Sequence, residues 1–169
     1  MEPHVRPACR LALRGATRLI ETAHVPRLDA ERIGLWRSLD RTVTAVARQI
    51  DIDLVEEFDL PLAWFEVMSA LQRAGGAMRV SRLCSELDEV PSSLSRRLDR
   101  MEGEGFVDRE ATPEPGDRRA VTVSLTREGR SLWRDANVIY RRGVQRHFAQ
   151  MVTETDIHAL QRLLAKLSR

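Results

Sequence analysis

One stretch of the chain, residues 80–125, decides the fold, and it reads VSRLCSELDEVPSSLSRRLDRMEGEGFVDREATPEPGDRRAVTVSL. Its first half predicts two short helices joined by a tight connection, one over 80–87 and one over 91–104. Pro91 has the φ that suits the first turn of a helix, and Gly103 suits a helix exit. The first half therefore has the spacing of a helix-turn-helix pair.

The second half changes from a helical to an alternating pattern. Apolar and polar residues alternate over Phe106–Arg109 and Val121–Leu125, as they do in half-buried strands. Between these runs, residues 113–119 hold two prolines, a glycine and several charges, which indicate a turn. The pattern predicts a β-hairpin with a charged tip.

Two short helices followed by such a hairpin form a winged helix-turn-helix, in which the second helix enters the major groove of DNA. On that helix Leu94, Leu98 and Met101 share one face, which we expect to be buried. Serines and arginines on the remaining faces are donors that suit phosphates and base edges; the alternative is a solvated charged face. We therefore predict DNA contacts by Arg79, Ser81, Ser92, Ser93, Ser95, Arg96, Arg97, Arg100, Arg118 and Arg119.

The hairpin tip has its own predicted roles. Arg118 and Arg119 would reach the adjacent minor groove, where narrow A·T stretches attract guanidinium groups. Asp117 suits an acceptor that orients an arginine of the tip, and Arg119 is the expected partner. A charged loop without DNA contacts is the alternative.

Long helical patterns lie on both sides of this lobe. Apolar residues recur at every third or fourth position over 30–58, and a further helix is expected to start at Asp59–Pro61. Thr126 suits the N-cap of a helix over 127–151, and Thr153 begins a last helix with a capping box. These patterns predict a mainly α fold with a small β-hairpin wing, of the α+β class.

The same patterns divide the chain into three parts. We expect residues 1–29 to form a helical N-terminal extension, 59–126 to form the winged helix-turn-helix lobe, and 30–58 with 127–169 to form a helical dimerisation region. The extension has an arginine at every fourth position from Arg6 to Arg18, and pairing with acids, contact with flanking DNA and solvation remain open for it. The long helices carry apolar stripes that the lobe alone cannot cover, which predicts a homodimer.

The chain resembles the MarR family of bacterial regulators from about Ile33 to Leu167. The segments that carry the resemblance are Leu83–Leu87, Ser92–Glu102, Gly105–Val107 and Gly116–Gly129. The resemblance implies a triangular homodimer whose first and last helices interlock, with Asp117 and Arg119 matching the wing motif Asp-x-Arg. It also implies binding to a palindromic double-stranded DNA near the regulator's own promoter.

Members of this family usually bind ligands between the dimer helices and the DNA-binding lobe. On that basis Trp36, Arg37, Trp64 and Phe65 are the predicted ligand-binding residues, and Arg37 would pair with an anionic group. The expected effector is a small aromatic or phenolic compound. For each aromatic residue, ordinary core packing is the alternative.

Other classes of function find little support in the sequence. The net charge is only +2, so DNA binding depends on where the arginines lie. No apolar run approaches the roughly 18 residues of a membrane span, and residues 1–10 lack the apolar block of a secretory signal. We therefore expect a cytoplasmic protein, nucleoid-associated when bound to DNA. The histidines lack metal-ligand spacing and no catalytic motif is present, so we expect no metal, no cofactor and no enzyme activity.

The predicted function is a sequence-specific transcriptional regulator, a homodimeric repressor of its own or a neighbouring operon that a small molecule releases. One alternative is a winged-helix scaffold that binds protein. Another is a regulator that senses oxidants through a cysteine, for which Cys9 beside Arg10 suits better than Cys84, which is expected in the core.

Overall fold

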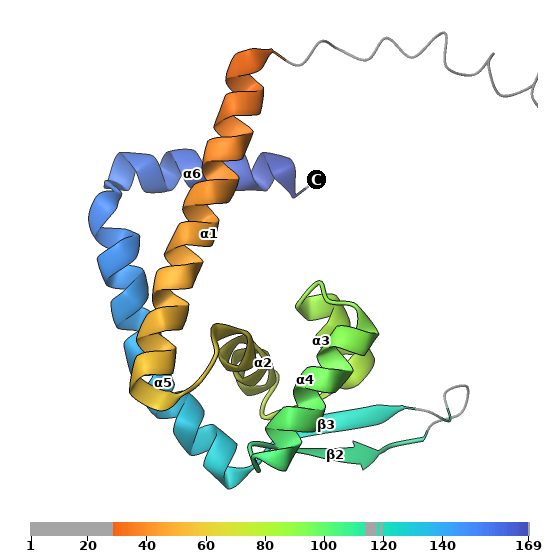
Figure 1. Ribbon diagram of the computed structural model, residues 1–169. Helices are drawn as coiled ribbons and strands as arrows, with labels where there is room; N and C mark the ends of the chain where they lie inside the picture. Colours follow the sequence, from red (N-terminus) through yellow and green to blue (C-terminus); the bar gives the residue numbers. More distant parts are fainter. Residues whose placement is uncertain (1–28, 114–117, 119, 169) are drawn as a thin grey trace, which may run out of the picture. The chain divides into compact units, whose positions relative to one another are not determined.

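The computed structural model describes residues 29–113, 118 and 120–168. Its elements are α1 (Ala30–Phe58), α2 (Leu62–Arg73), β1 (Ala77–Arg79), α3 (Val80–Glu86), α4 (Pro91–Gly103), β2 (Val107–Ala111), β3 (Val121–Leu125), α5 (Arg127–His147), the 3₁₀ helix η1 (Ala149–Met151) and α6 (Glu154–Leu167) (Figure 1). The predicted fold class, mainly α with a small β-hairpin wing, is confirmed. Among these described residues, no helix has both the length and the apolar character that crossing a membrane requires.

The chain consists of two compact units, of which the first ends at Leu39 and the second begins at Asp40. The helical extension predicted over residues 1–29 lies outside the described residues, except for Asp29. The Asp29 carboxylate accepts a hydrogen bond from the Arg32 amide at 2.7 Å, which satisfies one of the unpaired donors at the start of α1. All elements from α2 onward belong to the second unit.

The sheet has three antiparallel strands in the order β1-β3-β2. β2 and β3 form the predicted hairpin, with Val107 opposite Leu125 and Ala111 opposite Val121. β1, which the sequence pattern did not predict, pairs with the other edge of β3 and leads directly into α3. A strand of three residues is too short to show an alternating pattern, so only its pairing with β3 defines it.

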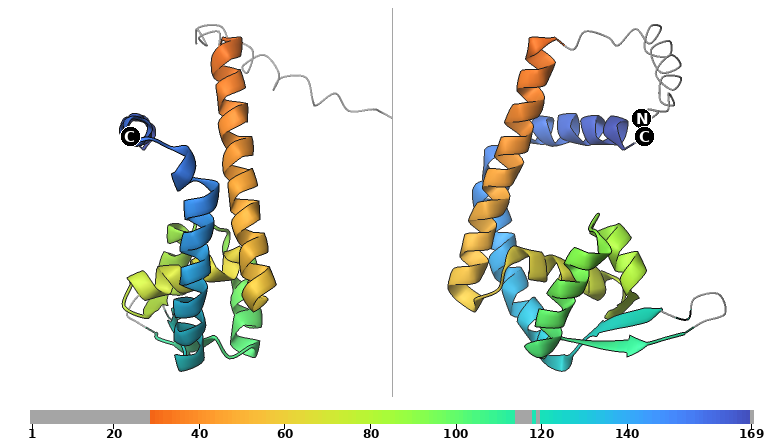
Figure 2. Two further views of the ribbon diagram at one scale, coloured as in Figure 1. Left: turned by 90° about the vertical axis from the view of Figure 1, so that its left-hand side faces the viewer. Right: turned by 45° about the vertical axis from the view of Figure 1, so that its right-hand side comes forward.

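The core of the winged lobe lies between its helices and the sheet. Figure 2 shows α3 and α4 beside the strands, and α5 running past α2. The predicted buried face of α4 is confirmed, since Leu94, Leu98 and Met101 are at most 1% exposed. From the other elements, Val67, Met68, Leu71, Leu83, Val107 and Val123 are buried beside them.

Close packing joins the wing to α5. The predicted N-cap is confirmed, because the Gly129 amide donates to Oγ1 of Thr126 at 2.9 Å, and this hydroxyl donates to the Gly105 carbonyl at 2.7 Å. A Cβ at Gly129 would overlap the carbonyl oxygen of Phe106, so only glycine fits there. Gly105 has a φ of 75°, a left-handed conformation that glycine adopts without strain.

Contacts of the same kind fix the second half of α1 against the lobe. The Asp51 carboxylate accepts a hydrogen bond from the Leu62 amide at 2.7 Å, so a side chain of α1 caps the start of α2. Ile50 and Leu54 of α1 are buried, and a Cβ at Gly143 of α5 would lie 3.1 Å from Cγ1 of Ile50. α1 and α5 therefore approach each other closely at these positions.

Two predicted helix boundaries differ from the structure. The helix expected over 127–151 ends at His147, and η1 follows it. The helix expected from Asp59 begins instead at Leu62, with Pro61 as its N-cap residue. The predicted capping box of the last helix is confirmed, because the Thr153 amide donates to Oδ2 of Asp156 at 2.9 Å and the Asp156 amide donates to Oγ1 of Thr153.

Candidate nucleic-acid interface

The outward face of α4 is polar and basic. Four of the residues predicted to contact DNA are exposed on it, namely Ser92, Ser95, Arg96 and Arg100, while Ser93 is half-buried. Val90, the N-cap residue, provides no side-chain hydrogen bond to the first turn. Pro91 has no amide N–H, and the Ser93 and Leu94 amides both donate to the Val90 carbonyl, so the polar character of this face comes from side chains.

Arg97 has surroundings unlike those of the other arginines of α4. Its side chain is only 14% exposed and forms an ion pair with Glu89. Oε2 of Glu89 is buried and has no hydrogen-bond partner among the described residues. The ion pair with Arg97 is therefore what stabilises the negative charge of this carboxylate. The structure therefore places Arg97 within the lobe, where it holds the connection between α3 and α4.

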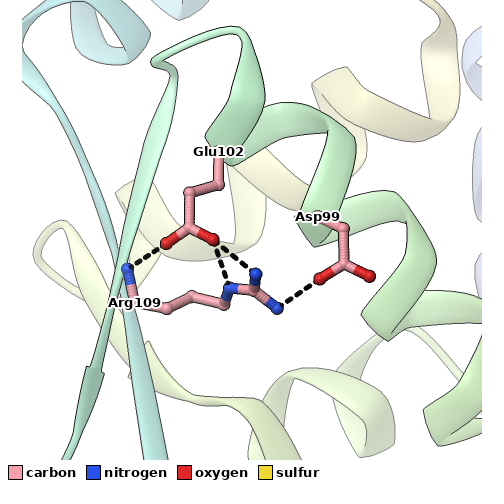
Figure 3. A network of polar contacts seen from close by, with 3 residues as sticks. All are labelled: Asp99, Glu102 and Arg109. Atoms are coloured by element: carbon pink, nitrogen blue, oxygen red, sulfur yellow. Dashed lines mark hydrogen bonds and ion pairs between the residues drawn. The ribbon is translucent and has the colours of Figure 1, made fainter.

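A second ion-pair network attaches α4 to the wing (Figure 3). Arg109 of β2 donates through Nε to Oε2 of Glu102 at 2.9 Å, and its Nη1 lies 2.7 Å from Oδ1 of Asp99. The Arg109 amide also donates to Oε1 of Glu102 at 3.2 Å. We call these three residues the α4–wing clamp, because they fix two turns of α4 to the first strand of the hairpin.

The hydrogen bonds of the clamp shift the pKa values of Glu102 and Arg109, and both shifts favour the charged form. Hydrogen bonds from Arg109 lower the pKa of the Glu102 carboxyl below its ordinary value. The hydrogen bonds to Glu102 and Asp99 raise the pKa of Arg109. Both groups are therefore charged at neutral pH, and α4 and the wing are held in one arrangement.

Three of the predicted contacts lie together at one cavity. Arg79, Ser81 and Ser95 line a space of about 470 Å³ between α3, α4 and the sheet. Arg109 of the clamp lines it as well. The cavity thus brings together residues from β1, α3 and α4 that lie 16 positions apart in the sequence at most.

The base of the wing is ordered by hydrogen bonds across the hairpin. The Thr112 amide donates to the Ala120 carbonyl at 2.8 Å, and the hydroxyl oxygens of Thr112 and Thr122 are 3.0 Å apart. Arg118 is exposed at the tip. The predicted contact Arg119 and the predicted orienting residue Asp117 lie outside the described residues.

The four predicted ligand-binding residues are divided between the two units. Trp36 and Arg37 belong to the first unit, and Trp36 is 66% exposed. Trp64 meets Phe106 edge to face, with ring centroids 6.2 Å apart, as core aromatics do. Phe65 is buried and lines a cavity between α2, α3 and α5.

This cavity of about 460 Å³, here called the α2–α5 cavity, contains residues that the sequence analysis missed. Besides Phe65 it is lined by Glu66, Ser69, Arg73, Glu86, Leu87, Trp133, Asn137 and Tyr140. A spacing of three or four residues places Trp133, Asn137 and Tyr140 on one face of α5. That spacing was a visible signal, but it did not show which helix would lie opposite.

The alternative of a cysteine sensor concerns two thiols. Cys84 of α3 is buried in the core of the lobe, as expected. Cys9 lies outside the described residues. Among the residues that are described, no group of three His, Cys, Asp or Glu side chains is placed to hold a metal ion.

Comparison with known proteins gives a consistent result for the sequence. The model of the MarR family matches residues 58–120, which run from the end of α1 to the start of β3. The chain is 33% identical over 109 residues to the HTH-type transcriptional regulator PecS of Dickeya dadantii. That match covers 63% of this chain and 64% of PecS, so this chain spans less than two thirds of that relative. The multiple antibiotic resistance protein MarR of Escherichia coli is 25% identical over 68% of this chain and 78% of its own length.

Solved structures share the fold. AbsC, a MarR family transcriptional regulator from Streptomyces coelicolor, superposes with a TM-score of 0.74 at 26% identity, over 83% of this chain and 94% of AbsC. A mutant of E. coli MarR complexed with operator DNA gives a TM-score of 0.70 at 25% identity, over 83% and 99% of the two chains. The winged lobe, its polar α4 face and the matched sequence agree, and over these regions the chain is similar to the MarR family, whose members are transcriptional regulators and not enzymes.

Proposed function

We propose that this chain binds palindromic double-stranded DNA as a homodimer and represses transcription until a small molecule releases it. The observation that carries the proposal is the exposed polar face of α4, held beside the wing by Arg109, Glu102 and Asp99. Such a helix, fixed relative to a hairpin, is the arrangement that reads the major groove. The similar E. coli MarR in complex with operator DNA supports the assignment.

Specific side chains have distinct tasks in this proposal. Arg96 and Arg100 lie one turn apart on α4, where each guanidinium suits the O6 and N7 atoms of a guanine or a phosphate. Ser92 and Ser95 suit phosphates at the groove edge. Arg79 and Ser81, beside the 470 Å³ cavity, extend the same surface, and Arg118 and Arg119 extend it to the minor groove with Asp117 as orienting residue.

A homodimer would cover apolar side chains that the single chain leaves exposed. On α6, Leu163, Leu164 and Leu167 are 41%, 59% and 66% exposed. On α1, Val43 is 60% exposed. A twofold dimer through these helices presents two copies of α4, which explains a palindromic site with half-sites roughly one helical turn apart.

Release by a small molecule requires a ligand that binds one conformer better than the other. The α2–α5 cavity supports this part of the proposal, because it lies between α5 and the helices α2 and α3 of the DNA-binding lobe. Phe65 is the one predicted ligand residue that lines it. A regulator of this kind would act in the cytoplasm, where the nucleoid is.

The test is a salt titration of binding to the DNA upstream of the chain's own gene. We expect nanomolar binding that weakens steeply with salt, and a loss of about 1–3 kcal/mol in the Arg96→Ala and Arg100→Ala variants. In the Arg118→Ala, Arg119→Ala double variant, the slope of log affinity against log salt concentration should become shallower by about two, because about two phosphate contacts are lost. Affinity can be measured by fluorescence anisotropy of labelled duplexes.

The control for these variants is Arg134→Ala, which removes an exposed arginine of α5 outside α3, α4 and the wing. Its affinity should equal that of the unchanged protein. Binding that is weak, indifferent to sequence and equal in all variants would contradict the proposal. That result would favour a protein-binding scaffold.

A further inference from the structure

The α2–α5 cavity has an aromatic wall that suits a flat ligand. The rings of Phe65 and Tyr140 are stacked, with centroids 4.7 Å apart and an interplanar angle of 26°. Trp133 is half-buried beside them, and its Nε1 donates to Oγ of Ser69 at 3.0 Å, which orients the indole. Faces of such rings attract cations through their quadrupoles.

The charges around the cavity are unequal. Arg73 is paired with Glu86, with Nη2 and Oε1 2.9 Å apart, so the charges of these two side chains offset each other. Glu66 lines the same cavity and has no ion pair or hydrogen bond with any described residue. Among the residues that line the cavity, the charged side chains are Glu66, Glu86 and Arg73. The local balance is one negative charge.

Glu66 is exposed to solvent on one side and partly desolvated by its neighbours on the other. Partial burial raises the pKa of its carboxyl, an effect that the charge of Glu89 adds to and the charge of Arg97 opposes. A cation placed in the cavity would stabilise this carboxylate, whereas an anion would be repelled by it. The ring wall and the carboxylate therefore favour the same ligand charge.

We propose that the α2–α5 cavity binds a flat aromatic cation, with the positive group at Glu66 and the ring against Trp133 and Tyr140. This inference rests on the small-molecule release proposed above and gives the effector its chemical class. The sequence led to the expectation of an aromatic or phenolic effector; the present inference keeps the aromatic ring and assigns it a positive charge, because Arg73 at the cavity is paired with Glu86. A volume of about 460 Å³ accommodates a ligand of one or two rings.

The test uses three ligands of nearly equal shape and different charge, which are benzamidine (cationic), benzamide (neutral) and benzoate (anionic). Isothermal titration calorimetry on the full chain without DNA measures each affinity at neutral pH. We expect benzamidine to bind about tenfold more tightly than benzamide, and benzoate to bind least. Glu66→Gln should remove the preference for benzamidine over benzamide, and Glu66→Asp should retain it.

The matched control is Glu104→Gln, which neutralises an exposed carboxylate after the end of α4, away from the cavity. It should leave the preference unchanged, and thermal unfolding should show that all variants are folded. Benzoate binding as tightly as benzamidine, an unchanged preference in Glu66→Gln, or no binding of any ligand at millimolar concentration would overturn the inference.

A parallel titration of operator DNA separates this inference from the function on which it rests. If benzamidine binds through Glu66 but leaves DNA affinity unchanged, the cation site stands and release by this ligand is wrong. If the chain binds no DNA at all, the repressor proposal fails while the charge preference is still measured directly.

Discussion

The helices α4 and α6 have similar amphipathic sequences but opposite environments. On α4 the apolar residues Leu94, Leu98 and Met101 are at most 1% exposed, because the strands and neighbouring helices cover them. On α6 the equivalent stripe includes Leu164 and Leu167, which are 59% and 66% exposed. An apolar stripe predicts that a helix face will be covered, but it does not say whether the cover comes from the same chain.

The two helices also begin differently. α6 starts with a complete capping box between Thr153 and Asp156, whose hydrogen bonds lower the pKa of the Asp156 carboxyl. α4 starts at Pro91 after Val90, without a side-chain cap. α6 therefore satisfies its own first turn with a side-chain cap, whereas α4 has no such cap and depends on the lobe for its stability.

The largest expected effect comes from removing a covered side chain of α4. Leu98→Ala should lower the free energy of unfolding by about 2–5 kcal/mol, because it leaves a cavity in a close-packed core. Urea unfolding followed by circular dichroism measures it. The loss should be the same at every protein concentration, since the contacts of Leu98 lie within one chain. In contrast, the loss of unfolding free energy in Leu164→Ala should become smaller as the protein is diluted, because Leu164 is expected to be covered only in the dimer. If both variants showed the same dependence on protein concentration, the proposed difference between α4 and α6 would be wrong.

A smaller effect on folding, but a large one on assembly, is expected for Leu164→Glu. A carboxylate on this stripe would be desolvated without a partner in a dimer, so the dissociation constant of the dimer should rise by about 100-fold. Sedimentation equilibrium measures the constant, and far-ultraviolet circular dichroism should be unchanged. His158→Glu, on the opposite face of α6, is the control and should leave assembly intact. A dimer that tolerates both variants would mean that α6 does not contribute to the interface.

The smallest effect is expected for Glu102→Gln in the α4–wing clamp. The pKa of Glu102 in the folded protein lies below its ordinary value of 4.5, so its contribution to stability is present above that pH and is lost as the pH falls through the lowered pKa. Because Glu102 and Asp99 are partly exposed, the difference between the variant and the unchanged protein should be under about 1 kcal/mol at neutral pH and should vanish in acid. Thermal unfolding over a pH series measures it, and a difference that does not change with pH would contradict the assignment.

Local patterns predicted much of the fold. The helix pair, the hairpin, the buried face of α4 and the caps at Thr126 and Thr153 are all present as expected. Each of them depends on residues within a few positions of one another, so periodicity and capping chemistry suffice. The close approach of Gly129 to Phe106 was not visible in this way, although Gly129 stands in the family motif.

The candidate site was less predictable because its neighbours are distant in the sequence. Arg97 has the sequence signature of an exposed arginine, yet Glu89 on the preceding connection binds it. Trp64 and Phe65 are adjacent in the sequence, but one packs in the core and the other lines the α2–α5 cavity. Their partners Phe106 and Tyr140 are 42 and 75 positions away.

The sequence by itself determined that the chain has a winged helix-turn-helix with a polar, arginine-bearing second helix, because burial patterns repeat along a helix or strand and need no knowledge of what covers them. Only the tertiary structure decided that β1 completes the sheet, that Arg109 clamps α4 to the wing, and that Glu66 lies at an aromatic cavity with its carboxylate unpaired among the described residues. These features depend on which distant side chains meet. Which distant side chains meet is determined by the packing of whole helices and strands against one another, and a local sequence pattern does not contain that information.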